Sequence, residues 1–298
     1  MVSRKHRMEY RALRGVAWVM CALPLRVALG LGWLLAVIGY GLAGKRRREV
    51  HRRIRQVLGD TVSEAEVRGI AWRAWRNLIF NIIDLIRSSR LTRAEIGRWF
   101  DAETAAPLLA WSKQNQGFIL AVGHMGNWDL AGVVFSLLGG RLFAMMRRQR
   151  NPLIDAYLNE LRSACGMGVV ERNSRALASV VRRLKKGEAL AILPDLRAKS
   201  PDGALQVDFL GGKAWVAGGM GLFARHAKVP IVVAITTRDG WVRHRWKTLE
   251  PIWPDESLDK DQDIERMTRE VMHRLDQAIR SQPDQYFWFN KRWVLEPF

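Results

Sequence analysis

From about residue 115 onward, short apolar runs alternate with longer stretches in which apolar and polar residues repeat at helical spacing. The apolar runs have the length of buried strands, and the amphipathic stretches have the length of helices that cover a sheet. The predicted strands are residues 117–124, 141–146, 188–195 and 230–237. The predicted helices are residues 127–140, 151–166, 174–187, 220–229 and, near the C-terminus, 261–280. Strands alternating with helices predict an α/β fold with a mostly parallel sheet flanked by helices.

A longer helix is predicted before the alternating region, over residues 65–87. Ser63 and Glu66 have the spacing of a capping box, and Thr92 with Glu95 repeats that spacing at the start of a further helix. Apolar residues recur along 65–87 at helical spacing and form a broad apolar face. Packing in the core is the simplest explanation of that face, and contact with lipid or an acyl chain is the alternative.

The N-terminal part of the chain contains a long apolar stretch, residues 15–44, in which Arg26 is the single charged residue. Its uninterrupted part runs from Val27 to Gly44, and a helix of that length is about 27 Å long, close to the hydrocarbon thickness of a bilayer. Anionic headgroups on the cytoplasmic side would bind the Arg-rich block that follows at 45–55. We therefore expect an N-terminal membrane-anchoring helix that spans the bilayer once or inserts deeply.

Two other structures could explain the same apolar stretch. A cleaved signal peptide is disfavoured because the stretch is long, starts late and ends in arginines rather than small residues. A buried hairpin within the globular domain stays open, since Pro24 would kink a helix and glycines are frequent. We expect residues 1–56 to form the anchor with its basic juxtamembrane segment, and residues 57–298 to form the main domain.

The charge of the chain favours anionic partners. Its 298 residues include 48 Lys and Arg against 29 Asp and Glu, for a formal net charge of +19. Nucleic acid, an anionic membrane, an acidic carrier protein and a phosphorylated substrate all satisfy such a charge. The arginines lack an aromatic stacking motif or a groove-binding helix, which argues against nucleic acid. Cys21 and Cys165 stand far apart without ligand spacing, so neither a disulfide framework nor a zinc site is indicated, and a reducing, cytosol-facing compartment fits.

The sequence GHMGNWD, residues 123–129, contains the candidate chemistry. His124 ends a predicted strand, and Asp129 begins the next helix, so the carboxylate could reach the imidazole, select its tautomer and stabilise its charged form. A structural hydrogen bond, a metal site and a catalytic dyad are the three alternatives. A metal would need more ligands than the neighbouring sequence offers. Without a nucleophile elbow, phosphate-binding loop or dinucleotide fingerprint, direct transfer onto a hydroxyl activated by His124 remains.

Five segments in a fixed order resemble one family. They are GHMGNWDLAG, RRQRNPLID with Arg147, Asn151 and Pro152, ILPD with Asp195, VDFLGGKA with Phe209 and Gly211, and QYFWFNKRW with Gln285, Tyr286, Trp288 and Arg292. The first resembles the His-x4-Asp/Glu box of the late acyltransferases of lipid A biosynthesis, the lauroyl and myristoyl transferase family, which includes mycobacterial phosphatidylinositol mannoside acyltransferases. With the N-terminal apolar helix, the resemblance covers nearly the whole chain.

The resemblance implies an activity and a location. The fold would be like that of glycerol-phosphate acyltransferases, anchored at the cytoplasmic face of the inner membrane. The enzyme would move a fatty acyl group from acyl carrier protein or acyl-CoA to a hydroxyl of a lipid A precursor, without a metal or organic cofactor. His124 would take the proton of the attacking hydroxyl, and Asp129 would support the imidazolium that forms.

The resemblance also suggests substrate-binding residues. Arg147 would hold the oxyanion or a substrate phosphate, with a structural salt bridge as the alternative. Asn151 lies in the same box, and Asp195 and Arg197 follow a predicted strand, so we group these three with the substrate-binding residues. Asp208 is a reserve carboxylate that could replace Asp129 as the partner of His124.

Two alternatives remain for the function. A phosphatidylinositol mannoside or other glycolipid acyltransferase has a very similar box, so the acceptor is the least determined part of the prediction. A non-enzymatic peripheral membrane protein would also explain the basic surface and the apolar N-terminus, but it would need neither His124 nor Arg147.

Overall fold

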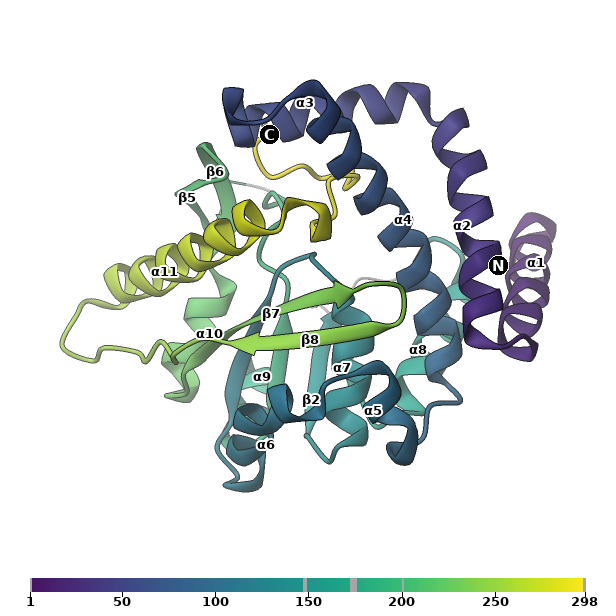
Figure 1. Ribbon diagram of the computed structural model, residues 1–298. Helices are drawn as coiled ribbons and strands as arrows, with labels where there is room; N and C mark the ends of the chain where they lie inside the picture. Colours follow the sequence, from purple (N-terminus) through teal and green to yellow (C-terminus); the bar gives the residue numbers. More distant parts are fainter. Residues whose placement is uncertain (1, 147–148, 172–175, 200, 297–298) are drawn as a thin grey trace.

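The computed structural model describes the chain except for residues 1, 147–148, 172–175, 200 and 297–298. A six-stranded sheet forms its centre (Figure 1). The strands are β1 (Phe118–Val122), β2 (Leu142–Met146), β3 (Gly168–Glu171), β4 (Ala189–Ile192), β7 (Ile231–Asp239) and β8 (Arg243–Thr248). They lie in the order β3-β2-β4-β1-β7-β8, and all neighbours are parallel except β7 and β8. The predicted α/β fold with a mostly parallel sheet is confirmed.

The predicted apolar runs contain β1, β2 and β4 in full and β7 up to Thr237, two residues short of its end. The runs do not include β3, β8 or a separate antiparallel hairpin of β5 (Ala204–Phe209) and β6 (Gly212–Ala217). The sequence of β8 explains why the apolar pattern does not predict this strand. It lies at the edge of the sheet and buries only alternate residues, His244 and Trp246, so it has no continuous apolar run.

Helices cover both faces of the sheet. On one face, Ile119 and Ala121 of β1 share a core cluster with α9 (Ala176–Lys185), α10 (Gly219–Ala227) and α11 (Lys260–Ser281). On the other face, the alternate residues of β1 pack with the remaining helices of this region. These helices are α5 (Ile96–Trp99), α6 (Ala106–Lys113) and α7 (Trp128–Leu137). Because every residue of β1 is buried, this strand lies at the centre of a three-layer fold.

The helix α4 (Glu64–Ser88) connects the N-terminal helices to this core. It begins with the predicted capping box of Ser63 and Glu66. Two N-terminal helices, α1 (Arg4–Ala22) and α2 (Leu25–Leu42), pack against it beside α8 (Pro152–Ser163) (Figure 1). The contact is close at Gly32, where an added Cβ would lie 2.3 Å from Ile83 Cδ1. The indole of Trp75 donates to the Ala36 carbonyl at 2.9 Å, so the inner face of α2 is bonded to the domain.

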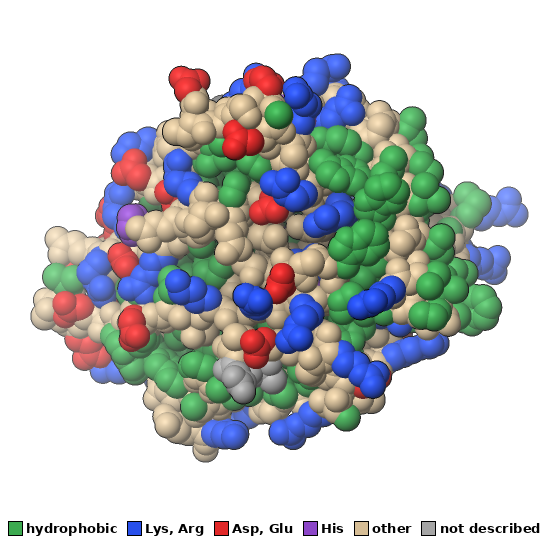
Figure 2. All heavy atoms as spheres, viewed as in Figure 1, with side chains coloured by type: hydrophobic (Ala, Val, Ile, Leu, Met, Phe, Trp, Pro, Cys, Tyr) green, Lys and Arg blue, Asp and Glu red, His purple; other side chains and the backbone are tan. Residues whose placement is uncertain are grey.

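The outer faces of α1 and α2 carry exposed apolar side chains. Among the large hydrophobic residues, Leu42 of α2 is 84% exposed and Trp18 of α1 is 69% exposed. In Figure 2 these hydrophobic side chains gather on the side where α2 lies in Figure 1, next to Lys and Arg side chains. Among the described residues, α2 is the one helix long and apolar enough to cross a membrane.

The helix α3 (Gly44–Leu58) carries the Arg-rich block and crosses the expected domain boundary. Its Val50 and Ile54 are fully buried in the same cluster as the sheet. Arg53 is also fully buried, and it donates to the carbonyls of Trp288 and Asn290 at 2.7 Å each. The basic segment therefore packs against the C-terminal tail, and the division at residues 56 and 57 stays a prediction.

Candidate active site

His124 lies just beyond the carboxyl end of β1, in the loop that leads to α7. The loop ends at Asn127, whose side chain caps α7 by accepting from the Leu130 N–H at 3.1 Å. Gly126 has a φ of +58°, and an added Cβ there would lie 2.2 Å from the Thr236 carbonyl oxygen. A glycine is therefore required for the loop to pass this close to β7.

Asp195 is the carboxylate that contacts the imidazole. Its Oδ1 lies 2.7 Å from His124 Nδ1, and its Oδ2 accepts from the His124 backbone N–H, also at 2.7 Å. The sheet explains the contact, because Ala121 of β1 is paired with Ile192 of β4 and each residue lies three positions beyond that pair. An ionised carboxylate only accepts, so Nδ1 is the donor and Nε2 has the free lone pair of the neutral ring.

The imidazole is accessible from one side. The His124 side chain is 15% exposed, while that of Asp195 is fully buried. Two aromatic rings stand beside it: the Trp128 centroid is 5.0 Å from the His124 centroid, and that of Phe287 is 6.5 Å away. In the part of the chain that the structure describes, no group bonds to Nε2. The imidazole is therefore partly exposed and is flanked by two aromatic rings.

The C-terminal tail holds the loop of His124 from outside. The His124 carbonyl accepts from the Phe287 N–H at 2.7 Å, and Met125 forms a β-bridge with Tyr286. The Tyr286 hydroxyl bonds to Asp195. Burial raises the pKa of Tyr286 well above its usual value, and the negative charge of Asp195 raises it further. The phenol therefore stays protonated and donates to the carboxylate of Asp195.

The structure corrects the expected position of two carboxylates. Asp129, the expected partner of His124, accepts from Arg162 instead, at 3.2 Å from Nε and 3.0 Å from Nη2. This pair joins α7 to α8, whereas Nδ1 of His124 faces the end of β4. Asp208, the reserve carboxylate, is 74% exposed on the β5–β6 hairpin and pairs with Lys213 at 2.6 Å.

The profile of the bacterial lipid A biosynthesis acyltransferase family matches residues 4–294. The chain belongs to this family. The family that the five sequence motifs predicted is confirmed, and the protein is an acyltransferase. A search of curated proteins finds no match.

Of the three other residues predicted to bind substrate in this acyltransferase, the structure describes two, Asn151 and Arg197. Arg147 lies outside the described residues. Asn151 caps α8 and donates through Nδ2 to the His6 carbonyl and to Glu9, both at 2.9 Å, so its amide connects α8 to α1. The carbonyl of Arg197 accepts from Arg292 of the tail. Their roles toward substrate stay predictions.

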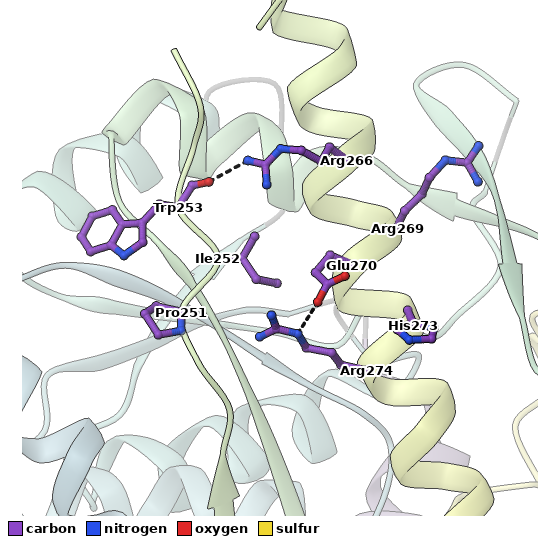
Figure 3. A pocket seen from close by; sticks show the side chains of 8 residues that line it. All are labelled: Pro251, Ile252, Trp253, Arg266, Arg269, Glu270, His273 and Arg274. Atoms are coloured by element: carbon purple, nitrogen blue, oxygen red, sulfur yellow. Dashed lines mark hydrogen bonds and ion pairs between the residues drawn. The ribbon is translucent and has the colours of Figure 1, made fainter. Parts of the chain in front are cut away.

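A cavity of about 550 Å³ lies beside α11 (Figure 3). Neither His124 nor Asp195 lines it. Arg266 donates to the Trp253 carbonyl and Arg274 pairs with Glu270, so both guanidinium groups are already engaged. In the described residues, no group of three or more His, Cys, Asp or Glu side chains could hold a metal ion.

Proposed function

We propose that this acyltransferase moves a fatty acyl group from a thioester carrier to a hydroxyl of a lipid A precursor, with His124 as general base. The observation that carries the proposal is the 2.7 Å contact between His124 Nδ1 and the buried Asp195, next to a partly exposed ring. A histidine with a purely structural role would need neither a partly exposed ring nor an Nε2 without a hydrogen bond among the described residues.

The reaction follows from the free lone pair of Nε2. As the acceptor oxygen attacks the thioester carbonyl carbon, Nε2 takes the hydroxyl proton and a tetrahedral oxyanion forms. The oxyanion then collapses, the carbon–sulfur bond breaks, and the thiolate takes the proton back from the imidazolium. The products are an ester and a free thiol. Asp195 stabilises the imidazolium between the two proton transfers.

Asp195 thus takes the supporting role that the sequence suggested for Asp129. We retain Asp129 as a residue of the site because its ion pair with Arg162 connects the helix that carries Trp128 to α8. Arg147 is proposed to stabilise the oxyanion or to bind a substrate phosphate, since a guanidinium group offers several donors in a rigid plane.

The donor is proposed to be acyl carrier protein, with acyl-CoA as the alternative. Both are anionic, and the net charge of +19 favours their approach. The same charge suits a phosphorylated glycolipid acceptor. The phosphatidylinositol mannoside acceptor named among the alternatives carries a phosphate too, so charge does not separate the two acceptors.

We propose that α1 and α2 anchor the enzyme at the cytoplasmic face of the inner membrane by inserting their outer faces into one leaflet. The inner face of α2 is bonded to α4 through Trp75, and Ala28 and Leu29 are fully buried. A helix held in this way presents its exposed residues, such as Leu35 and Ile38 at 53% each, to the lipid. Extraction of membranes with alkaline carbonate tests the anchor, and complete release of the protein would contradict deep insertion.

The function is tested with purified enzyme, labelled acyl carrier protein and two acceptors, a lipid A precursor and a phosphatidylinositol mannoside. The wild type should acylate the lipid A precursor, and His124→Ala should abolish transfer while the protein stays folded. His226→Ala, at an exposed histidine of α10, is the matched control and should remain active. Transfer to the mannoside alone would overturn the acceptor, and an active His124→Ala enzyme would overturn the general base.

A further inference from the structure

A cluster of polar side chains contacts the loop of His124 at Gly126 and Asn127. We call it the Asp84 cluster, and its members are Asn81 and Asp84 of α4, Asn127 at the start of α7 and Arg238 of β7. The side chains of Asp84 and Arg238 are 1% and 0% exposed. The proton transfers proposed above use none of these groups.

The cluster is bonded directly to the loop. Asp84 forms an ion pair with Arg238, and its Oδ2 also accepts from Asn127 Nδ2 at 3.0 Å. Arg238 donates to Asn81 Oδ1 at 2.7 Å, and Asn81 Nδ2 donates to the Gly126 carbonyl at 2.5 Å. Gly126 and Asn127 are therefore both connected to the buried ion pair. Asn127 is bonded to Asp84 directly, and Gly126 is connected to Arg238 through Asn81.

A second path from Arg238 reaches the loop through the tail. The backbone N–H of Arg238 donates to Gln285 Oε1 at 2.8 Å, and the carbonyl of Gln285 accepts from the Gly126 N–H at 2.9 Å. Gly126 is thus held at both its N–H and its carbonyl by groups that Arg238 orients. The next residues of the tail are Tyr286 and Phe287, which contact Asp195 and the His124 carbonyl.

His244 completes the surroundings of the ion pair. Its Nε2 is 3.4 Å from Asp84 Oδ2, and its ring stacks on Phe100 at 5.6 Å between centroids. Burial lowers the pKa of His244, and the positive charge of Arg238 lowers it further, so the ring is neutral. The single charges of Asp84 and Arg238 therefore balance each other.

Stability alone does not explain a buried ion pair at this position. Apolar residues of similar volume often replace such a pair without loss of stability, because removing two charges from water is costly. What apolar residues would not supply is a set of directional bonds to Asn127, Asn81 and Gln285. The geometry of catalytic groups is sensitive to such bonds, since a shift of about 1 Å can lower a rate by about 10²-fold.

We propose that the Asp84 cluster is a positioning network for the acyl-transfer dyad. It holds Gly126 and Asn127, so that the imidazole of His124 keeps its contact with Asp195 and Nε2 faces the acceptor. Trp128, which follows Asn127, is placed beside the imidazole by the same bonds. The inference rests on the proposed role of His124 as general base.

Four variants test the network. Asp84→Asn removes the charge of the carboxylate, and the double variant Asp84→Asn with Arg238→Gln removes both charges, so that no unpaired charge remains. Asn127→Ser keeps an N-cap for α7 but loses the bond to Asp84, and it serves if the other two fail to fold. Asp263→Asn is the matched control, because Asp263 is a fully buried carboxylate of α11 that pairs with Arg225, outside the cluster.

The kinetic and NMR measurements distinguish a positioning role of the Asp84 cluster from a contribution to protein stability alone. In Asp84→Asn, the double variant and Asn127→Ser, kcat should fall by about 10²-fold with little change in KM, whereas Asp263→Asn should keep the wild-type kcat. In protein labelled with 15N-histidine, the wild type and Asp263→Asn should show a downfield proton on Nδ1 of His124, assigned by its loss in His124→Ala. The three cluster variants should lose or broaden that signal.

Two results would overturn the positioning role. One is a double variant that regains thermal stability together with wild-type kcat, which would make the cluster merely structural. The other is a cluster variant that retains both the Nδ1 signal and kcat. Failure of the proposed function is distinguishable, because His124→Ala would then remain active while the NMR signal would still report the position of the ring.

Discussion

Asp195→Asn tests the dyad with almost no change in shape. Asp195 accepts two hydrogen bonds of 2.7 Å from His124, one from the backbone N–H and one from Nδ1, and its side chain is fully buried. An asparagine offers one oxygen and one NH₂ group where the aspartate offers two oxygens. Either the backbone N–H or the ring nitrogen of His124 therefore loses its acceptor.

The expected loss of rate follows from these bonds. If the amide oxygen stays with the backbone N–H, the NH₂ group faces Nδ1 and favours the tautomer with the proton on Nε2, which cannot act as a base. Restoring the active tautomer leaves a buried donor unsatisfied at a cost of about 1–3 kcal/mol, and the lost charge-assisted bond to the imidazolium removes about 1.5–3 kcal/mol. At about 1.36 kcal/mol for each tenfold change, kcat should fall by about 10²- to 10⁴-fold.

The assay is transfer of a labelled acyl chain from acyl carrier protein to a lipid A precursor, at saturating concentrations of both substrates. Thermal melting shows whether the variant is folded. Asp263→Asn, which removes a buried carboxylate of α11 that pairs with Arg225, controls for the loss of a buried charge and should retain kcat. A folded Asp195→Asn enzyme with wild-type kcat would refute the reasoning that this carboxylate selects the tautomer.

Four further predictions follow from particular contacts. Asp129→Asn should lower kcat by less than Asp195→Asn, because its partner is Arg162 rather than His124, and a loss as large as that of Asp195→Asn in the same assay would contradict this. Tyr286→Phe should lower kcat by about tenfold through the lost bond to Asp195, and an unchanged pH–rate profile and kcat would exclude that contact from catalysis. Leu35→Arg should weaken binding to vesicles without changing transfer to detergent-solubilised acceptor, because the outer face of α2 is exposed, and equal vesicle binding would exclude this face. Burial raises the pKa of Asp84, but the charge of Arg238 and the hydrogen bonds from Arg238 and His244 together bring this pKa below its usual value. The resulting stabilisation is complete above the unfolded pKa of about 3.9 and is lost as the pH falls through the lower folded value. Asp84→Asn should therefore flatten the acid side of a plot of melting temperature against pH, and parallel curves for variant and wild type would contradict the assignment.

The apolar pattern was sufficient to predict the fold class and the main strands. Continuous apolar runs are typical of buried parallel strands, and β1, β4 and β7 follow this rule. The two edge strands β3 and β8 do not: β8 buries only alternate residues, and Gly168 to Val170 of β3 are only partly buried. The capping boxes of Ser63 and Thr92 were also predicted from the sequence, because their hydrogen bonds join residues only three positions apart.

Spacing along the sequence did not predict which carboxylate contacts His124. Asp129 is close in sequence, which made it the natural candidate, but helix direction points it to Arg162. Asp195 is 71 residues away from His124 and reaches it because β1 and β4 are neighbours in register. Sequence motifs marked both residues as family positions without indicating that they touch. Of the Asp84 cluster, only Asn127 lies in one of the five motifs, because α4 and β7 contribute Asn81, Asp84 and Arg238 as isolated polar residues.

The sequence by itself determined the family, the fold class and the histidine that we assign to the chemistry, because these depend on local patterns and motifs along the chain. Tertiary structure alone decided which carboxylate bonds to that histidine, how the tail holds its loop and which face of α2 stays exposed. The physical reason is the same in each case. Hydrogen bonds and burial depend on the order of strands and the packing of helices, which bring together residues that no sequence spacing relates.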